Sequence, residues 1–254
     1  MIKLKKYVIL ITIAIIVLTT GFISTAKATI KQHILEIEQK PAEVQEEVSD
    51  NVPAPDKTSI QDTVNEQENQ QKQDNQEKTF SAILHEKGIT TLASGLKILV
   101  DKSDHTLSLV YNGTSLKSYH VELGSGGMED KEVEGDRKTP EGTFYVTNKE
   151  VLDPADEYLG TRWLGVSYPN AEDANRGLNQ GLIDERTYDD IIDAFNRVQN
   201  PPQDTVLGGN IGIHGGSVPS FGSNWTWGCI GLSNADIEDF YNYITVGTPI
   251  IVQQ

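Results

Sequence analysis

The sequence contains a single cysteine, Cys229, and few histidines, so it lacks the side chains that several common kinds of site require. One thiol cannot form an internal disulfide, and His33, His85, His105 and His120 do not have the spacing of a metal site. Basic residues are also scarce: 21 Lys and Arg face 37 Asp and Glu, and the formal net charge is −16. This balance argues against the basic patches that nucleic-acid binding needs. We therefore expect no metal, no cofactor and no nucleic-acid partner.

A long apolar run occurs at the N-terminus. Lys3, Lys5 and Lys6 precede an apolar run from Tyr7 to Ile23, and the small-residue tripeptide Ala26-Lys27-Ala28 follows it. This layout is typical of a secretory signal, although a run of about 17 residues also reaches the lower limit for spanning a bilayer. Residues 1–28 are therefore predicted to be a signal peptide cleaved after Ala28 or a retained membrane anchor. Both predict export to the extracellular face, with the lysines left inside and no membrane contact beyond this segment.

Glycine and aromatic residues are absent between Lys40 and Lys78, where Glu, Gln, Asp, Asn and Lys dominate. Such a segment cannot bury enough apolar surface to offset the entropy lost on ordering. We predict that residues 29–79 form a disordered acidic linker. A polar helical stalk over residues 63–78 is the alternative.

The remaining sequence predicts a mainly β fold with short helices, of the α+β class. A short helix over residues 80–87 lies in a lead-in segment, 80–93, and one compact domain spans residues 94–254. Apolar alternation predicts strands over residues 96–100, 107–111 and 116–123, with Asn112-Gly113 as a hairpin turn, and strand patterns resume at 143–146 and 250–252. The pattern indicates antiparallel strands rather than βαβ units.

Two helices are predicted inside this domain. Tyr188, Ile191, Ile192, Phe195 and Val198 recur at helical spacing before Pro201-Pro202. A second helix begins after a capping residue at Ser233 and buries Ile237, Phe240, Tyr241 and Ile244. Residues 152–181 fit either one wall of a cleft or a solvated loop.

The candidate chemistry lies in one glycine-rich stretch. His214 is expected at the end of a strand, and Cys229 follows 15 positions later (229 − 214) in a turn between Gly228 and Gly231. A neighbouring imidazole is the common means of producing a nucleophilic thiolate, and glycine lets backbone N–H groups approach an oxyanion. The alternatives are a buried, inert cysteine and a structural histidine. In an exported protein, however, a lone thiol calls for a reason such as catalysis or intermolecular pairing.

Together these residues resemble the L,D-transpeptidase catalytic domain (YkuD) family, and more narrowly its YafK-like branch. The resemblance covers residues 94–254 and rests on four motifs in order: Gly-Asp-x-x-Thr-Pro-Glu-Gly at 135–142, His214-Gly215, Gly228-Cys229, and Gly-Thr-Pro at 247–249. It implies a YkuD-like β-sandwich or barrel that acts on peptidoglycan stem peptides through a thioester intermediate, in cell-wall biogenesis and cell shape. No cofactor is implied, and a monomer is the expected state.

The resemblance also implies roles for individual residues. Cys229 would be the nucleophile and His214 the general base, with the Gly215 carbonyl orienting the imidazole. The N–H groups of Gly228 and Cys229 would form the oxyanion site. The terminal D-alanine would leave, and an amine or water would then resolve the thioester.

The sequence departs from the family pattern on both sides of the cysteine. The family carries Ser/Thr-His-Gly-Cys, then a hydrophobic residue and Arg, whereas here Trp227 replaces the histidine and Gly231 the arginine. Thr226 and Trp227 are predicted to bind substrate. Carboxylate recognition must come from elsewhere, and the candidates by residue type are Arg137, Arg162 and Arg176.

Three other functions stay open. A peptidoglycan L,D-carboxypeptidase or amidase of the same fold would use water as the acceptor. A non-enzymatic wall-binding module would use Phe221, Trp225 and Trp227 to stack on sugar rings. A sortase-like transpeptidase is disfavoured because no arginine follows Cys229.

Overall fold

The computed structural model describes residues 78–92 and 94–254, so the predicted signal or anchor segment and almost all of the predicted linker lie outside the described residues. Within these residues, no helix has the length and apolar character needed to cross a membrane. The elements in chain order are α3 (Phe80–Glu86), β1 (Leu96–Asp101), β2 (Thr106–Tyr111), β3 (Thr114–His120), β4 (Gly142–Asp156), β5 (Gly160–Val166), α4 (Ala171–Asn179), α5 (Glu185–Asn196), β6 (Gly212–His214), the 3-10 turn η1 (Pro219–Phe221), β7 (Ile230–Gly231), α6 (Asn234–Tyr241) and β8 (Pro249–Gln253).

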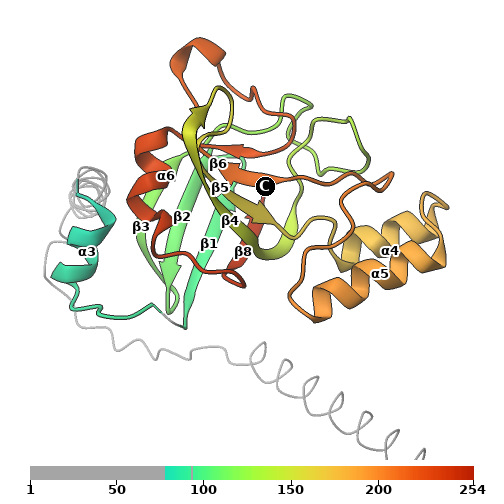
Figure 1. Ribbon diagram of the computed structural model, residues 1–254, viewed down its shortest axis with the longest axis horizontal. Coiled ribbons are helices and arrows are strands. Elements are labelled where there is room, and N and C mark those ends of the chain that lie inside the picture. Colours follow the sequence, from blue (N-terminus) through green and yellow to red (C-terminus); the bar gives the residue numbers. More distant parts are fainter. Residues whose placement is uncertain (1–77, 93) are drawn as a thin grey trace, which may run out of the picture. The chain divides into compact units, whose positions relative to one another are not determined.

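The strands form one eight-stranded sheet in the order β3-β2-β1-β8-β4-β5-β6-β7 (Figure 1). The predicted hairpin is confirmed between β2 and β3. Its two turn residues, Asn112 and Gly113, have φ values of 48° and 83°, which is the left-handed conformation that a two-residue hairpin turn requires. Alternate residues of β1 and β2 are buried, as the apolar alternation predicted.

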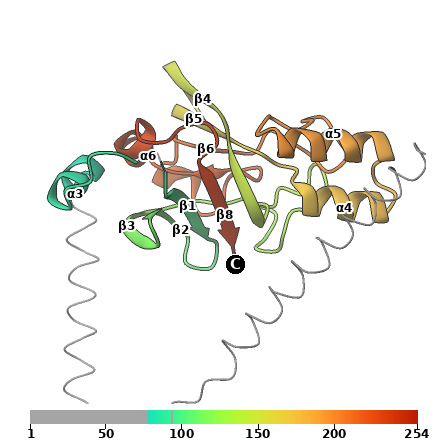
Figure 2. The same ribbon diagram turned by 90° about the horizontal axis from the view of Figure 1, so that it is seen from below.

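The antiparallel pairing expected of the first strands is confirmed, since β1 pairs with β2 and β2 with β3 in antiparallel fashion. The complete sheet is mixed. β1 pairs in parallel with β8, and β6 pairs in parallel with β7. The last strand of the chain, β8, lies between β1 and β4 (Figure 2). Its apolar residues Ile250 and Val252 are buried, which matches the burial of a strand at the centre of a sheet.

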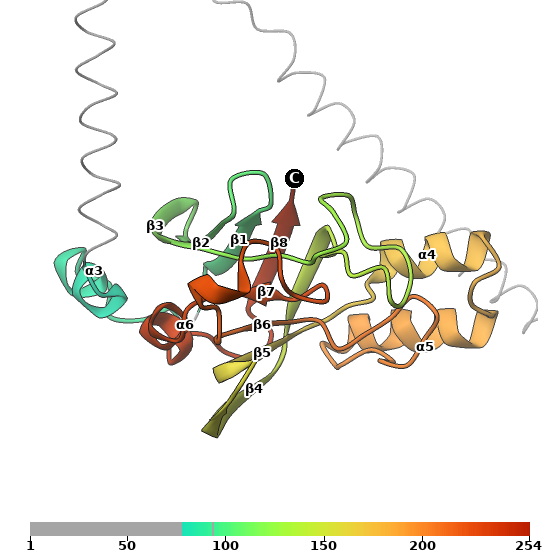
Figure 3. The same cartoon turned by 90° about the horizontal axis from the view of Figure 1, so that it is seen from above.

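The two edges of the sheet are joined to each other. The chain continues beyond β3 and runs past β7 (Figure 3), where Glu122 and Gly231 exchange two backbone hydrogen bonds of 2.8 Å each. A further bridge joins Gly124 to Thr226. This barrel-like closure places residues 121–126 beside the turn that carries Cys229. The prediction of a mainly β fold with short helices is confirmed.

Two short helices, α3 and α6, pack together at one end of the sheet. α3 confirms the predicted lead-in helix, and its Phe80, Ile83 and Leu84 join the main core. The Asp239 carboxylate on α6 accepts the Phe80 N–H at 2.9 Å and binds the Lys117 ammonium at 2.7 Å. A half-buried carboxylate thus fixes α3 to the domain.

The other helix pair, α4 and α5, lies side by side away from α3 and α6 (Figures 1 and 2). It encloses a small separate cluster of Ala174, Ile183, Ile191 and Leu207. α5 confirms the predicted helix, but it ends at Asn196, and Val198 beyond it is exposed. α4 was not predicted.

Candidate active site

β6 and β7 place the histidine and the cysteine on the same face of the sheet. Ile213 pairs with Ile230 and His214 with Gly231, and Cys229 immediately precedes β7. Since side chains alternate along a strand, the buried Ile213 and Ile230 face the core while His214 and Cys229 both face the other side. His214 is the last residue of its strand, as predicted.

The imidazole is fixed by its neighbours. His214 Nδ1 lies 2.7 Å from the Gly215 carbonyl oxygen, which can only accept, so Nδ1 carries the hydrogen and Nε2 remains the basic nitrogen. This is the contact that the family resemblance implies for Gly215. The ring stacks on Trp163 at 6.0 Å and meets Trp225 edge-on at 5.8 Å. Burial lowers the pKa of His214, against the opposing effects of the Gly215 bond and the Asp156 charge.

The thiol rests in its neutral form. Cys229 is half-buried, and burial raises the pKa of its thiol to about 11, although the Gly212 N–H and the Lys131 charge act the other way. The sulfur donates to the Asn210 carbonyl at 3.7 Å. No hydrogen bond between His214 and Cys229 occurs among the described residues, so the direct bond expected for an activated pair is not formed. A neutral thiol donates to the carbonyl beside it, and the proton has to transfer before or during attack.

The turn before the cysteine is held by one hydroxyl. Thr226 Oγ1 donates to the Cys229 carbonyl at 2.7 Å and accepts the Gly228 N–H at 3.2 Å. The Gly228 N–H is therefore engaged inside the turn, which contradicts its predicted role as an oxyanion donor. Thr226 is buried and shapes the turn, which contradicts a role in contacting substrate. The Cys229 N–H donates none of the hydrogen bonds found outside the strand ladders of the described residues, and it remains the candidate oxyanion donor.

Cys229 opens onto a cavity of about 480 Å³. Its other walls come from β4, β5 and the chain before β6, and they are formed by Thr147, Asn148, Glu150, Leu152, Leu159, Trp163, Gly165, Val166, Asn200, Gln203, Asn210 and Ile211. Five of these belong to residues 152–181, so the cleft-wall alternative for that segment is the one observed.

Sequence reasoning missed Trp163 and Asn210. A Cβ at Gly212 would lie 2.3 to 2.5 Å from three carbons of the Trp163 ring, so glycine at this position is what admits the ring beside His214. Gly212, two residues before His214, was the available signal. Asn210 has a positive φ of 54°, and this conformation was not evident from the sequence.

The three candidate arginines lie in different places. Arg162 is directed to α6, where it lies 3.7 Å from Glu238 and over the Tyr241 ring, and it does not line the cavity. Arg176 is 3.0 Å from Asp173 and does not line the cavity either. Arg137 does not line the cavity either, but of the three it alone lies beside the cysteine turn, with its guanidinium 5.1 Å from the centre of the Trp227 ring. Within the described part of the chain, no cluster of His, Cys, Asp or Glu could hold a metal ion.

Comparisons with known proteins give the family of the chain. The family model "L,D-transpeptidase catalytic domain" (YkuD) matches residues 96–252. YafK of Escherichia coli (strain K12) is 26% identical over 158 residues, which are 61% of this chain and 49% of YafK. The chain therefore spans about half the length of the curated relatives it matches.

Solved structures with a similar fold include three bacterial proteins. Bd1075 of Bdellovibrio bacteriovorus is 24% identical with a TM-score of 0.42, over 63% of this chain and 48% of that one. The helical cell shape determining protein Pgp2 of Campylobacter jejuni is 23% identical with a TM-score of 0.40, over 69% and 55%. An L,D-transpeptidase of Mycobacterium smegmatis is 19% identical with a TM-score of 0.36, over 63% and 59%. Because the family model covers more than half of the sequence, the chain belongs to the YkuD family of L,D-transpeptidase catalytic domains.

Proposed function

We propose that the protein is an exported, cysteine-dependent L,D-transpeptidase that acts on peptidoglycan stem peptides. The observation that carries this proposal is the placement of Cys229 and His214 on one sheet face, with the cysteine at the wall of a cavity and Nε2 as the basic nitrogen. Family membership supports an enzyme of this kind. The predicted signal or anchor over residues 1–28 supports export to the cell wall.

The first half of the reaction forms a thioester. As the Cys229 sulfur attacks the carbonyl carbon of the third stem residue, its proton passes to Nε2 of His214. The Cys229 N–H donates to the developing oxyanion. The C–N bond to the terminal D-residue then breaks, and the departing nitrogen takes the proton from the imidazolium. The free D-amino acid leaves.

The second half regenerates the thiol. An amine of another stem peptide attacks the thioester carbon and gives a proton to Nε2, and a new amide forms as the C–S bond breaks. The sulfur then takes the proton back from His214. Since the thiol pKa is about 11 and that of His214 is lowered, both groups begin and end neutral. Water in place of the amine would give a carboxypeptidase with the same thioester.

The test is product analysis with the full chain. We expect incubation with disaccharide-tetrapeptide to yield cross-linked dimers and free D-amino acid by mass spectrometry, and Cys229→Ala to yield neither. Tripeptide without dimers would replace the transpeptidase proposal by the carboxypeptidase. Peptidoglycan binding without any turnover would favour the wall-binding module. Equal turnover in Cys229→Ala would contradict both enzyme proposals.

A further inference from the structure

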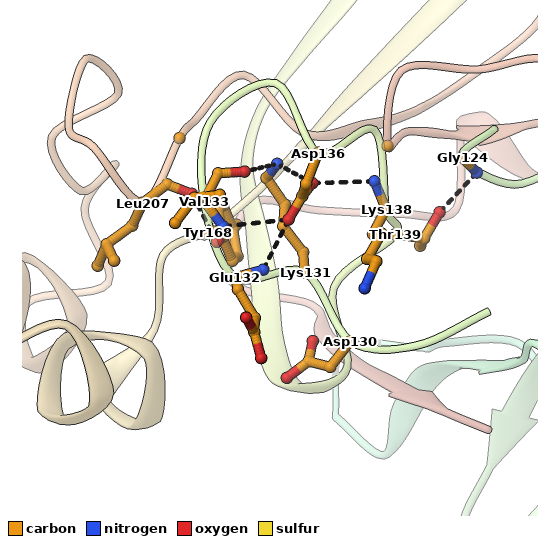
Figure 4. A network of polar contacts seen from close by, with 12 residues as sticks. Gly124, Asp130, Lys131, Glu132, Val133, Asp136, Lys138, Thr139, Tyr168 and Leu207 are labelled. Atoms are coloured by element: carbon orange, nitrogen blue, oxygen red, sulfur yellow. Dashed lines mark hydrogen bonds and ion pairs between the residues drawn. The ribbon is translucent and has the colours of Figure 1, made fainter. Parts of the chain in front are cut away.

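Arg137 lies on a loop that a buried ion pair holds in place. The Asp136 carboxylate binds the Lys131 ammonium at 2.8 Å and also accepts the backbone N–H groups of Glu132, Val133 and Lys138 at 2.8 to 3.0 Å (Figure 4). Lys131 is 2% exposed. The Asp136 carboxylate thus binds residues that precede it and a residue that follows it in the loop. These bonds fix the backbone on both sides of Arg137.

The backbone of Arg137 also fits closely against its surroundings. Its φ is 57°, a left-handed conformation that is uncommon for a residue with a side chain. Its carbonyl accepts the Gly126 N–H at 2.9 Å. The next residue, Lys138, packs against the cysteine turn. Its carbonyl oxygen lies so close to Gly228 that a Cβ at Gly228 would be only 2.8 Å away. The loop therefore packs directly against the turn that precedes Cys229.

This backbone directs the Arg137 side chain over Trp227, which is 75% exposed. A cation–π contact holds the guanidinium in place without using its N–H donors. Among the described residues, no hydrogen bond or ion pair is found for the guanidinium of Arg137 or of the exposed Arg186 on α5, whereas Arg162, Arg176 and Arg197 each have an acidic partner. Arg137 differs from Arg186 in being held over an aromatic ring. In a chain with a net charge of −16, an unpaired and positioned arginine beside the turn that precedes the nucleophile is suited to an external anion.

We propose that Arg137, held over Trp227, binds a carboxylate of the peptide substrate beside Cys229. The planar guanidinium matches a carboxylate with two parallel N–H bonds, which gives both attraction and orientation. The proposal rests on the proposed function, because it takes the substrate to be a stem peptide. Such a peptide carries a terminal carboxylate and side-chain carboxylates, and the experiment separates them.

The experiment measures kcat and KM of the full-length protein with tetrapeptide, and with analogues amidated at the terminal or at a side-chain carboxylate. We expect Arg137→Gln to lower kcat/KM about tenfold on free tetrapeptide, mainly through KM. On the analogue that lacks the recognised carboxylate, the variant and the wild-type protein should be equal. Arg137→Lys should recover part of the loss. Arg186→Gln, at an exposed arginine on α5, is the matched control and should change nothing.

Binding is measured separately from turnover. In a Cys229→Ala background, calorimetry should show that Arg137→Gln weakens tetrapeptide binding about tenfold, with Arg186→Gln unchanged. Loss of turnover with this binding difference intact would contradict the proposed reaction and leave the carboxylate site standing. The site is overturned if Arg137→Gln has no effect, if it weakens all three peptides equally, or if the Cys229→Ala protein binds no tetrapeptide.

Discussion

Replacing Asp136 by asparagine should destabilise the domain, because it leaves the Lys131 charge without its partner. The amide keeps one acceptor oxygen but cannot serve the four donors that the carboxylate now binds, which are the Lys131 ammonium and three backbone N–H groups. Removing one partner of a buried pair costs about 3–5 kcal/mol. Asp136 is 14% exposed and Lys131 keeps its bond to the Val133 carbonyl, so we expect the lower end, about 3 kcal/mol.

Urea unfolding of the full chain measures this cost as a lower midpoint at constant slope. Asp189→Asn, at an exposed residue of α5, is the matched control and should have almost no effect. In a Lys131→Met background the cost of Asp136→Asn should fall to about 1 kcal/mol, because no buried charge is then left unpaired. A cost below about 0.5 kcal/mol, or the same cost in both backgrounds, would refute the reasoning.

The same carboxylate predicts the direction of a pH effect. Burial raises the pKa of Asp136, but the Lys131 bond and the three N–H bonds outweigh it, and the net shift is downward. A pKa that is lower in the folded than in the unfolded state contributes stability above the unfolded value, near 4. This contribution should disappear as the pH falls through the folded value, and Asp136→Asn should remove it.

Three further predictions concern the cysteine and its surroundings. Because burial raises the thiol pKa to about 11, alkylation of Cys229 by iodoacetamide should accelerate with pH and remain well below its maximum at pH 8; a plateau by pH 8 would contradict the neutral resting pair. Gly212→Ala would force a methyl group into the Trp163 ring, costing about 1–3 kcal/mol of stability and lowering kcat, and an unchanged unfolding midpoint would argue against that contact. Thr226→Val should lower kcat more than tenfold and cost about 1–3 kcal/mol, while Thr226→Ser should retain most activity; equal kcat in the two variants would show that the hydroxyl does not hold the turn.

Local sequence patterns predicted much of the fold. Apolar alternation predicted β1, β2 and β8, Asn112-Gly113 predicted the hairpin, and Ser233 predicted the start of α6. These features depend on a few neighbouring residues. α4 was missed because its residues are mostly polar, although its capping box between Asn170 and Asp173 is a readable signal.

Long-range pairing was not predictable in the same way. The insertion of β8 between β1 and β4 and the bond pair between Glu122 and Gly231 join segments far apart in the chain, and no local pattern records them. The site also combines features that local sequence patterns predict with contacts that they do not predict. The strand end at His214 was predicted, but the thiol contact with Asn210 depends on how separate loops pack. The engaged N–H of Gly228 depends on the side-chain conformation of Thr226 within the turn.

The central claim is that Cys229 carries the acyl group. Intact-protein mass spectrometry of the full chain, quenched in acid after mixing with tetrapeptide in the absence of an acceptor amine, tests it most directly. We predict a mass increase equal to the acyl portion that remains after loss of the terminal D-residue, located on Cys229 and absent from Cys229→Ala. Turnover in Cys229→Ala, or an acyl group on any other residue, would contradict the claim.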